Sequence, residues 1–159
     1  MSRVPLTKDG EVAIKKKLAN LKFVERPRVS ASIAEARAHG DLKENAEYHA
    51  AKDKQSFTEG RITELEDVIS RSEVIDLTKL TGKTITFGTK IKIVDEETDL
   101  ETFYEIVGPY EADLNSGLIS IASPIAKALI GKELGSSVVV TTPRGEKNYE
   151  VLSIEILKP

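Results

Sequence analysis

The pattern of apolar and polar positions changes its period once along this chain of 159 residues. From Thr7 to about Ser72, apolar side chains recur every three or four residues, which is the spacing of one face of an α-helix. From about Leu80, branched apolar residues alternate with Thr, Lys and Glu, which is the spacing of β-strands with one buried face. The sequence therefore predicts an α+β protein whose helices precede its sheet.

Proline and glycine divide the helical half into three predicted helices. Because Pro27 lacks an N–H group and is tolerated best at a first helical position, we expect a first helix to about Phe23, a break at 24–26 and a second helix from Pro27 to His39. Gly40 supplies a left-handed stop, and a third helix of roughly 25 residues follows. Two helices joined by a few residues predict an antiparallel hairpin, which here extends about 40 Å.

The second half predicts a small, mainly antiparallel sheet with one short helix. The predicted strands lie within "KTITFGTKIKIVD", "LETFYEIVG", "GLISIAS", "SSVVVTTP" and "KNYEVLSIEIL", and turn residues separate them. In "SPIAKALIGK", Ser123 is a favoured N-cap, Pro124 suits the first helical position, and Gly131 can end the helix.

The change in period also predicts the domain organisation. We assign residues 1–75 to the helical hairpin, residues 76–82 to a linker and residues 83–159 to the sheet domain. No internal repeat or low-complexity tract complicates this division.

Composition narrows the possible classes of function. The absence of cysteine excludes disulfides and thiolate zinc sites, and two histidines, His39 and His49, are too few for a histidine cage, so oxygen ligands must hold any metal. The net charge of −3 argues against binding of nucleic acid through a broadly basic surface. No stretch approaches the roughly 18 apolar residues of a membrane span, so we expect a cytoplasmic protein without a membrane partner.

Two acidic residues, Asp41 and Glu44, follow Gly40 at a spacing of three. One interpretation is structural: Asp41 would be the N-cap of the third helix and Glu44 its capping-box partner. The other is chemical, because carboxylates at this spacing on a first helical turn can share one Mg²⁺. Two carboxylates leave most of an octahedral shell to other ligands, so the pair is at most half of a metal site. Spacing alone leaves both interpretations open.

Four basic residues lie near this acidic pair: Arg37, Lys43, Lys52 and Lys54. They could attract a phosphate chain. A solvated helix face gives the same pattern, so periodicity alone does not favour the binding of nucleic acid.

One long segment adds a more specific observation. "IAEARAHGDLKENAEYHAAKDKQSFTEGRI", residues 33–62, resembles the signature of bacterial Gre transcript-cleavage factors. The resemblance continues through "EADLNSGLISIASPIAKALIGKELGSSVVVTTPRG" and covers essentially the whole chain. It implies an N-terminal antiparallel coiled coil and a C-terminal domain similar to FK506-binding proteins.

The resemblance also implies a partner and a reaction. The C-terminal domain would dock on bacterial RNA polymerase, and the coiled coil would enter its secondary channel. Asp41 and Glu44 would there complete the site of a second Mg²⁺, with which the polymerase hydrolyses its own transcript in backtracked complexes. In this interpretation the protein is an accessory factor and not an enzyme, and the free protein is a monomer that does not hold Mg²⁺ tightly.

Further roles follow from the resemblance, position by position. Arg37 and Lys52 would form a small basic patch that contacts the RNA 3′ end. Arg also occurs in the family where Lys52 stands, and a lysine offers a point charge in place of the bidentate phosphate contact of an arginine. Ser123 and Pro124 would belong to the polymerase-docking surface, with Asp113 as a further candidate.

Three other functions fit parts of the sequence. A regulator of the same architecture could occupy the channel and inhibit, although such relatives have altered tips. A peptidyl-prolyl isomerase or chaperone would use the C-terminal domain and would need an apolar pocket with an aromatic floor. A coiled-coil adaptor would need only a capped hairpin.

Overall fold

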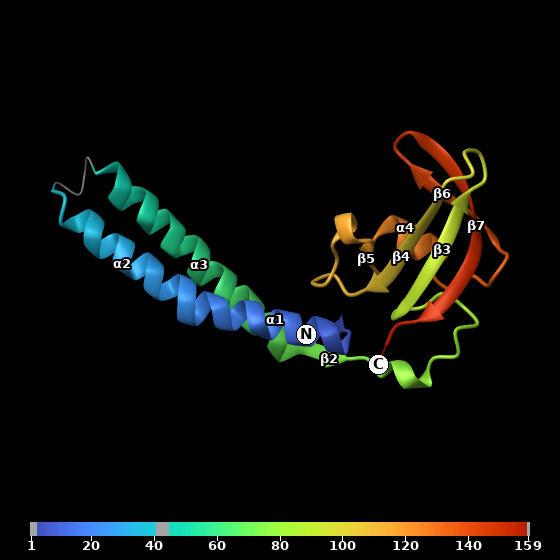
Figure 1. Cartoon of the computed structure of the whole chain (residues 1–159), viewed down its shortest axis with the longest axis horizontal. Coiled ribbons are helices and arrows are strands. Elements are labelled where there is room, and N and C mark those ends of the chain that lie inside the picture. The colour runs from blue at the N-terminus through green and yellow to red at the C-terminus, as the bar shows by residue number, and fades with distance from the viewer. Residues whose placement is uncertain (1–2, 41–44, 159) are drawn as a thin grey trace. The chain divides into compact units, whose positions relative to one another are not determined.

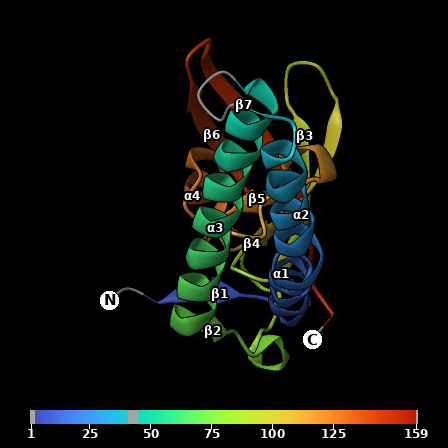
Figure 2. The same cartoon turned by 90° about the vertical axis from the view of Figure 1, so that its left-hand side faces the viewer.

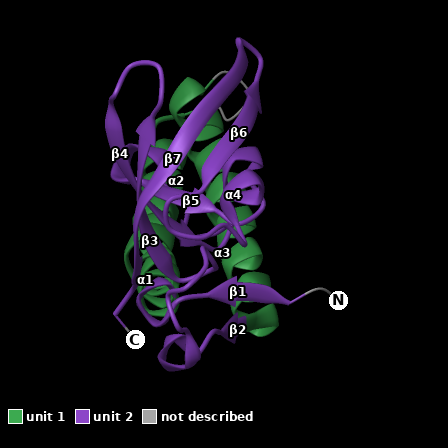
Figure 3. Cartoon of the chain, turned by 90° about the vertical axis from the view of Figure 1, so that its right-hand side faces the viewer, with its two compact units in different colours: residues 1, 11–72 green, residues 2–10, 73–159 purple. Residues whose placement is uncertain are grey.

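The computed structural model describes residues 3–40 and 45–158. These residues form two compact units, coloured separately in Figure 3. One unit is helical and comprises residues 11–72, and the other joins the N-terminal segment through Gly10 to the chain from Glu73 onward. Helices dominate the first unit and a five-stranded sheet dominates the second (Figure 1), which confirms the predicted α+β fold.

The first part of the chain stays helical through the predicted break. It consists of α1 (Lys8–Asn20), a five-residue π-helix, η1 (Leu21–Glu25), and α2 (Arg26–Arg37). The expectation of an interruption near residues 24–26 is therefore wrong, and the second helix begins one residue before Pro27 and ends at Arg37.

The π-helix explains why Pro27 does not break the chain's path. A proline ring clashes with the carbonyl four residues earlier, here that of Phe23, and leaves that carbonyl without its donor. In η1 the hydrogen bonds widen to five residues, since the N–H group of Arg26 donates to the Leu21 carbonyl. The wider turn accommodates the proline within a continuous helical segment.

The predicted hairpin is confirmed. α3 (Ala46–Arg71) has 26 residues and packs against α2, and Figure 2 shows the two helices side by side. None of the described helices combines the length and the apolar character that a bilayer crossing requires. The buried residues of the two helices are Val29, Ile33, Ala36, Thr58, Ile62, Leu65 and Val68.

Ion pairs across the hairpin fix its register. The Arg26 guanidinium bonds both carboxylate oxygens of Glu59 at 2.8 Å each, and Lys22 Nζ lies 3.4 Å from Glu66 Oε2. The hydrogen bond with Arg26 lowers the pKa of Glu59, and the same bond raises the pKa of Arg26. Because both side chains are exposed, the pair contributes little stability, and its main effect is geometric.

The sheet unit contains the predicted strands in the order β5-β4-β3-β7-β6. All neighbouring strands are antiparallel except β4 and β5, which are parallel. The expectation of a mainly antiparallel sheet is thus confirmed. The strands are β3 (Thr89–Asp95), β4 (Glu101–Val107), β5 (Leu118–Ser120), β6 (Ser137–Thr142) and β7 (Gly145–Ile156).

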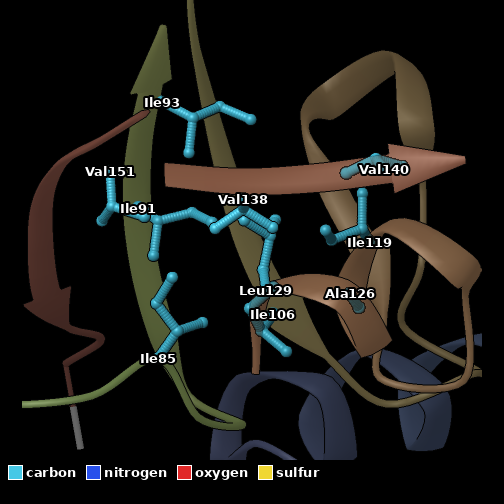
Figure 4. Packing of buried hydrophobic residues seen from close by; sticks show 10 residues of the cluster. All are labelled: Ile85, Ile91, Ile93, Ile106, Ile119, Ala126, Leu129, Val138, Val140 and Val151. Carbon is cyan, nitrogen blue, oxygen red and sulfur yellow. The ribbon is translucent and has the colours of Figure 1, made fainter. Parts of the chain in front are cut away.

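One face of this sheet forms the core together with the predicted short helix, α4 (Pro124–Leu129). Buried side chains alternate along β3, so Ile91 and Ile93 both point into the core. Ala126 and Leu129 of α4 lie in the same core, as Figure 4 shows. All four are at most 1% exposed. Burial of one strand face therefore produces the period of two that the sequence displays.

The sequence pattern does not predict two short strands. β1 (Val4–Leu6) and β2 (Ser72–Val74) form a two-stranded sheet, and each has only three residues, which is too short to show an alternation. The segment expected as a linker contains a 3-10 helix, η2 (Leu77–Lys79). Its first residue is buried beside Gly88, at which an added Cβ would lie 2.3 Å from the Leu77 side chain.

A carboxylate distant in sequence caps the start of α1. The N–H group of Thr7 donates to Glu111 Oε1 at 2.6 Å, the Thr7 hydroxyl donates to Glu111 Oε2, and the N–H group of Gly10 donates to Thr7 Oγ1 at 3.0 Å. In an ordinary capping box the glutamate occupies the third helical position. Here that position is Gly10, and a Cβ on it would lie 2.0 Å from Glu111 Cδ. Glu111 thus takes the place of the missing side chain.

We expect Gly108→Ala to destabilise the sheet unit. An added Cβ at Gly108 would lie 2.0 Å from the Pro5 carbonyl oxygen, a backbone atom that cannot rotate away. Overpacking of this kind costs roughly 1–3 kcal/mol of the free energy of unfolding, measured by urea denaturation. Gly60→Ala, where nothing lies within 4 Å, is the matched control and should raise helix stability by up to about 1 kcal/mol. Equal effects of the two substitutions would contradict the close approach.

We also expect a pH dependence from Glu111. Burial raises the pKa of its carboxyl above the ordinary value of 4.5, and the nearby Asp9 raises it further, although the bonds from Thr7 oppose the shift. The protonated form is therefore favoured by folding, so this contribution to stability is complete below pH 4.5 and is lost as the pH rises through the raised pKa. The difference in the free energy of unfolding between wild type and Glu111→Gln should change with pH in that window. A difference that stays flat across this window would contradict the raised pKa of Glu111.

Candidate functional site

The side chain of Asn45 joins the two helices at the end of the hairpin. Its Oδ1 accepts a hydrogen bond from the N–H group of Tyr48 at 3.0 Å, which makes Asn45 the N-cap of α3. Its Nδ2 donates to the Ala36 carbonyl in the last turn of α2 at 2.6 Å. One amide therefore caps a free N–H group at the start of one helix and adds a second hydrogen bond to a carbonyl near the end of the other, which also accepts from the N–H group of His39.

The interpretation of Asp41 as the cap of this helix is wrong. α3 begins at Ala46, and Asn45 provides the cap instead. A carboxylate could accept from the first turn of α3, but it could not donate to the carbonyl of Ala36, whereas an amide does both. Asp41 and Glu44 lie outside the described residues. The sequence signal for the observed cap was an asparagine, a favoured N-cap, directly before the helical pattern.

Arg37 and Lys52 lie on the same side of the hairpin end. The Arg37 guanidinium lies over the Tyr48 ring, with Cζ 5.8 Å from the ring centroid. Lys52 follows Tyr48 by one helical turn of α3, and residues so spaced share a face. The Lys52 ammonium bonds the neutral Gln55 side chain at 3.1 Å. Tyr48 thus contacts Arg37 directly and precedes Lys52 by one helical turn.

Arg37 differs from the other arginines in residues 11–72 because it forms no ion pair with a described residue. Each of the other four forms an ion pair with a Glu or Asp side chain. Within the part of the chain that the structure describes, neither Arg37 nor Lys52 forms an ion pair. Two cations on one face without a described carboxylate partner are a suitable arrangement for an anionic ligand. The paired arginines are Arg26, Arg28, Arg61 and Arg71.

The candidate docking residues flank β5. Ser123 caps α4, since its Oγ accepts from the N–H group of Ala126 at 3.3 Å, and Pro124 occupies the first helical position, as predicted. Asp113 precedes β5, and its Oδ2 accepts from the Ser116 hydroxyl at 2.9 Å. Each of the three has a local structural role, and their contact with a polymerase stays a prediction.

The described residues contain no group of three or more His, Asp or Glu side chains that could hold a metal ion. The Mg²⁺ site predicted at Asp41 and Glu44 involves residues outside this set. It therefore stays a prediction, as does the need for further ligands from a partner.

Two models of known protein families match this chain, and together they include most of both units. Residues 4–74 match the family model described as "Transcription elongation factor, N-terminal", and residues 80–156 match "Transcription elongation factor, GreA/GreB, C-term". The chain belongs to the GreA/GreB family of transcription elongation factors. The resemblance to Gre factors that residues 33–62 carry is thereby confirmed.

Two relatives, from Rhizobium etli and Caulobacter vibrioides, agree with this assignment. "Transcription elongation factor GreA" of Rhizobium etli is 58% identical over 154 residues, which are 97% of this chain and 98% of the relative. The protein of the same name from Caulobacter vibrioides is 55% identical over 157 residues, with 99% and 100% covered. A crystal structure of GreA factor homolog 1 of Thermus thermophilus is 27% identical, covers 96% of this chain and 99% of that chain, and has a TM-score of 0.44.

We expect Asn45→Ala to loosen the hairpin end. The substitution removes both the cap of α3 and the donor to Ala36, and loss of an N-cap costs about 1 kcal/mol. Hydrogen exchange of the Tyr48 amide should accelerate roughly fivefold. Asn45→Ser is the control, because a hydroxyl can cap α3 but is too short to reach α2. It should restore most of the protection at Tyr48, and identical exchange in both variants would contradict the capping role.

Proposed function

We propose that this protein binds bacterial RNA polymerase, inserts its hairpin into the secondary channel and stimulates Mg²⁺-dependent cleavage of the RNA 3′ end in backtracked complexes. Membership in the GreA/GreB family of transcription elongation factors supports a role on RNA polymerase. The observation that carries the finer proposal is the pair Asp41 and Glu44, which the chain places between the two long helices of the hairpin. Removal of the displaced 3′ segment would let elongation resume.

The dimensions of the hairpin support insertion into a deep channel. At 1.5 Å per residue, the 26 residues of α3 extend about 39 Å. Its packing against α2 and the ion pairs along it keep the two helices in register. A hairpin of this length can present side chains at its end to a site that a compact domain could not enter.

In this proposal Asp41 and Glu44 supply carboxylate oxygens, the ligand type that Mg²⁺ prefers. Two carboxylates cannot complete an octahedral shell, so the polymerase and the RNA would supply the remaining ligands. Held there, a second Mg²⁺ would help to activate a water and to stabilise the leaving oxygen in phosphodiester hydrolysis. The protein would thus be an accessory factor and not a nuclease on its own, and free Mg²⁺ would bind it weakly.

Arg37 and Lys52 would hold the phosphates of the extruded RNA. Both are exposed at one face of the hairpin end, and neither is neutralised by a described carboxylate. Arg37 can make two parallel bonds to one phosphate, whereas Lys52 acts as a single point charge.

The sheet unit would carry the contact with the polymerase through the surface around Asp113, Ser123 and Pro124. Ser123 caps α4 with Pro124 in its first turn, and Asp113 accepts a hydrogen bond from the Ser116 hydroxyl, so each of these residues has a defined local position. In this proposal the protein acts in the bacterial cytoplasm and is a monomer when free.

The test uses a purified bacterial polymerase stalled in a backtracked complex, with Mg²⁺ present. Wild type should release short 3′ fragments, while Asp41→Asn and Glu44→Gln should each lower the cleavage rate at least about 100-fold without loss of polymerase binding. Asp53→Asn, at an exposed acid of α3, is the matched control and should cleave normally.

Each outcome of this assay decides a part of the proposal. Absence of 3′ fragments with wild type would end the cleavage proposal, and slowed nucleotide addition in its place would favour the inhibitor. Normal cleavage by both neutral variants would end the metal role of the two acids.

A further inference from the structure

Arg37 is held by an aromatic ring where the other arginines of residues 11–72 are held by carboxylates. This difference has a chemical consequence. A carboxylate binds the N–H edge of a guanidinium and neutralises it, so a phosphate must compete for the same donors. A ring attracts the guanidinium through the quadrupole of its face and has no carboxylate oxygens to take the N–H donors, so both the charge and the donors stay available.

The backbone that carries the ring is held by the same side chain that joins the helices. Asn45 bonds the backbone N–H group of Tyr48 through Oδ1 and the carbonyl of Ala36, the residue before Arg37, through Nδ2. The backbone positions that carry the ring and the guanidinium are therefore tied to one amide. Tyr48 is also partly buried, which limits the freedom of its ring.

We propose that Tyr48 is a positioning residue, which holds the Arg37 guanidinium ready to receive an RNA phosphate. The inference rests on the proposed function and deepens it, since it explains how a long, exposed side chain could bind without first losing its own freedom. An arginine restricted before its ligand arrives loses less conformational entropy on binding. Tyr48 acts through Arg37 and does not touch the reacting atoms.

The chemistry of the ring predicts which substitutions matter. The quadrupole of the aromatic face attracts the guanidinium, and phenylalanine has the same face without the hydroxyl. Leucine keeps the apolar bulk and the helical propensity but has no such face. Tyr48→Phe should therefore retain the function of the ring, and Tyr48→Leu should lose it.

The first experiment measures cleavage in backtracked complexes against the concentration of the factor. Tyr48→Leu should raise the concentration for half-maximal cleavage about threefold, in line with a cation–π contact at an exposed site, with the maximal rate unchanged. Tyr48→Phe should match wild type. Phe57→Leu, at an aromatic residue of α3 that is 73% exposed, is the matched control and should also match wild type.

A double-mutant comparison separates positioning from a merely structural role. In an Arg37→Ala background, Tyr48→Leu should have no further effect, because the ring then has nothing to position. If Tyr48→Leu raised the concentration for half-maximal cleavage threefold in both backgrounds, the proposal would be overturned, and the substitution would have a general effect on the hairpin.

A second readout does not depend on cleavage. The side-chain Nε–H signal of Arg37 in the nuclear magnetic resonance spectrum of the free protein should carry a ring-current shift in wild type and Tyr48→Phe, and should lose it in Tyr48→Leu. An unchanged signal in Tyr48→Leu would overturn the positioning role. If wild type itself cleaved nothing, the proposed function would fail, and this signal would still decide whether Tyr48 holds Arg37.

Discussion

The hairpin end depends on one amide that does two opposite things. The first turn of α3 needs acceptors for its N–H groups, and the last turn of α2 needs donors for its carbonyls. Asn45 offers both from a single side chain, through its bonds to Tyr48 and Ala36. A carboxylate could accept from α3 but could not donate to α2, and a serine hydroxyl is too short to reach α2, so either would remove this bond between the helix ends. The contact between Arg37 and Tyr48 follows from this connection, since each lies next to or at a bonded position.

Much of the fold was predictable because burial imposes a local period on the sequence. The helical seam, the alternation in β3 and the cap of α4 at Ser123 all follow from neighbours in the chain, and the structure confirms them. Pro27 shows where a local rule fails. The rule concerns hydrogen bonds between residues four apart, whereas the bond from Arg26 to Leu21 spans five and lets the helix continue.

Interactions between distant residues left no signal in the sequence. Glu111 and Thr7 are 104 positions apart, and the close approaches that require Gly10 and Gly108 become visible only when the chain is folded. The site shows the same limit. Resemblance to a family could name two basic residues, Arg37 and Lys52, but it did not name Tyr48, over whose ring the Arg37 guanidinium lies. The structure therefore adds the relation between residues that the sequence could only name one by one.

The arginines of the hairpin have two kinds of partner. Where a guanidinium serves the register, as in the pair of Arg26 with Glu59, a carboxylate neutralises it and nothing remains for a ligand. Where the charge lies over a ring, as at Arg37, no described carboxylate neutralises it. A protein with a net charge of −3 cannot attract RNA over its whole surface, so any positive potential must be concentrated at a few positions. The partner of each arginine, and not the net charge of the protein, then determines where an anion can bind.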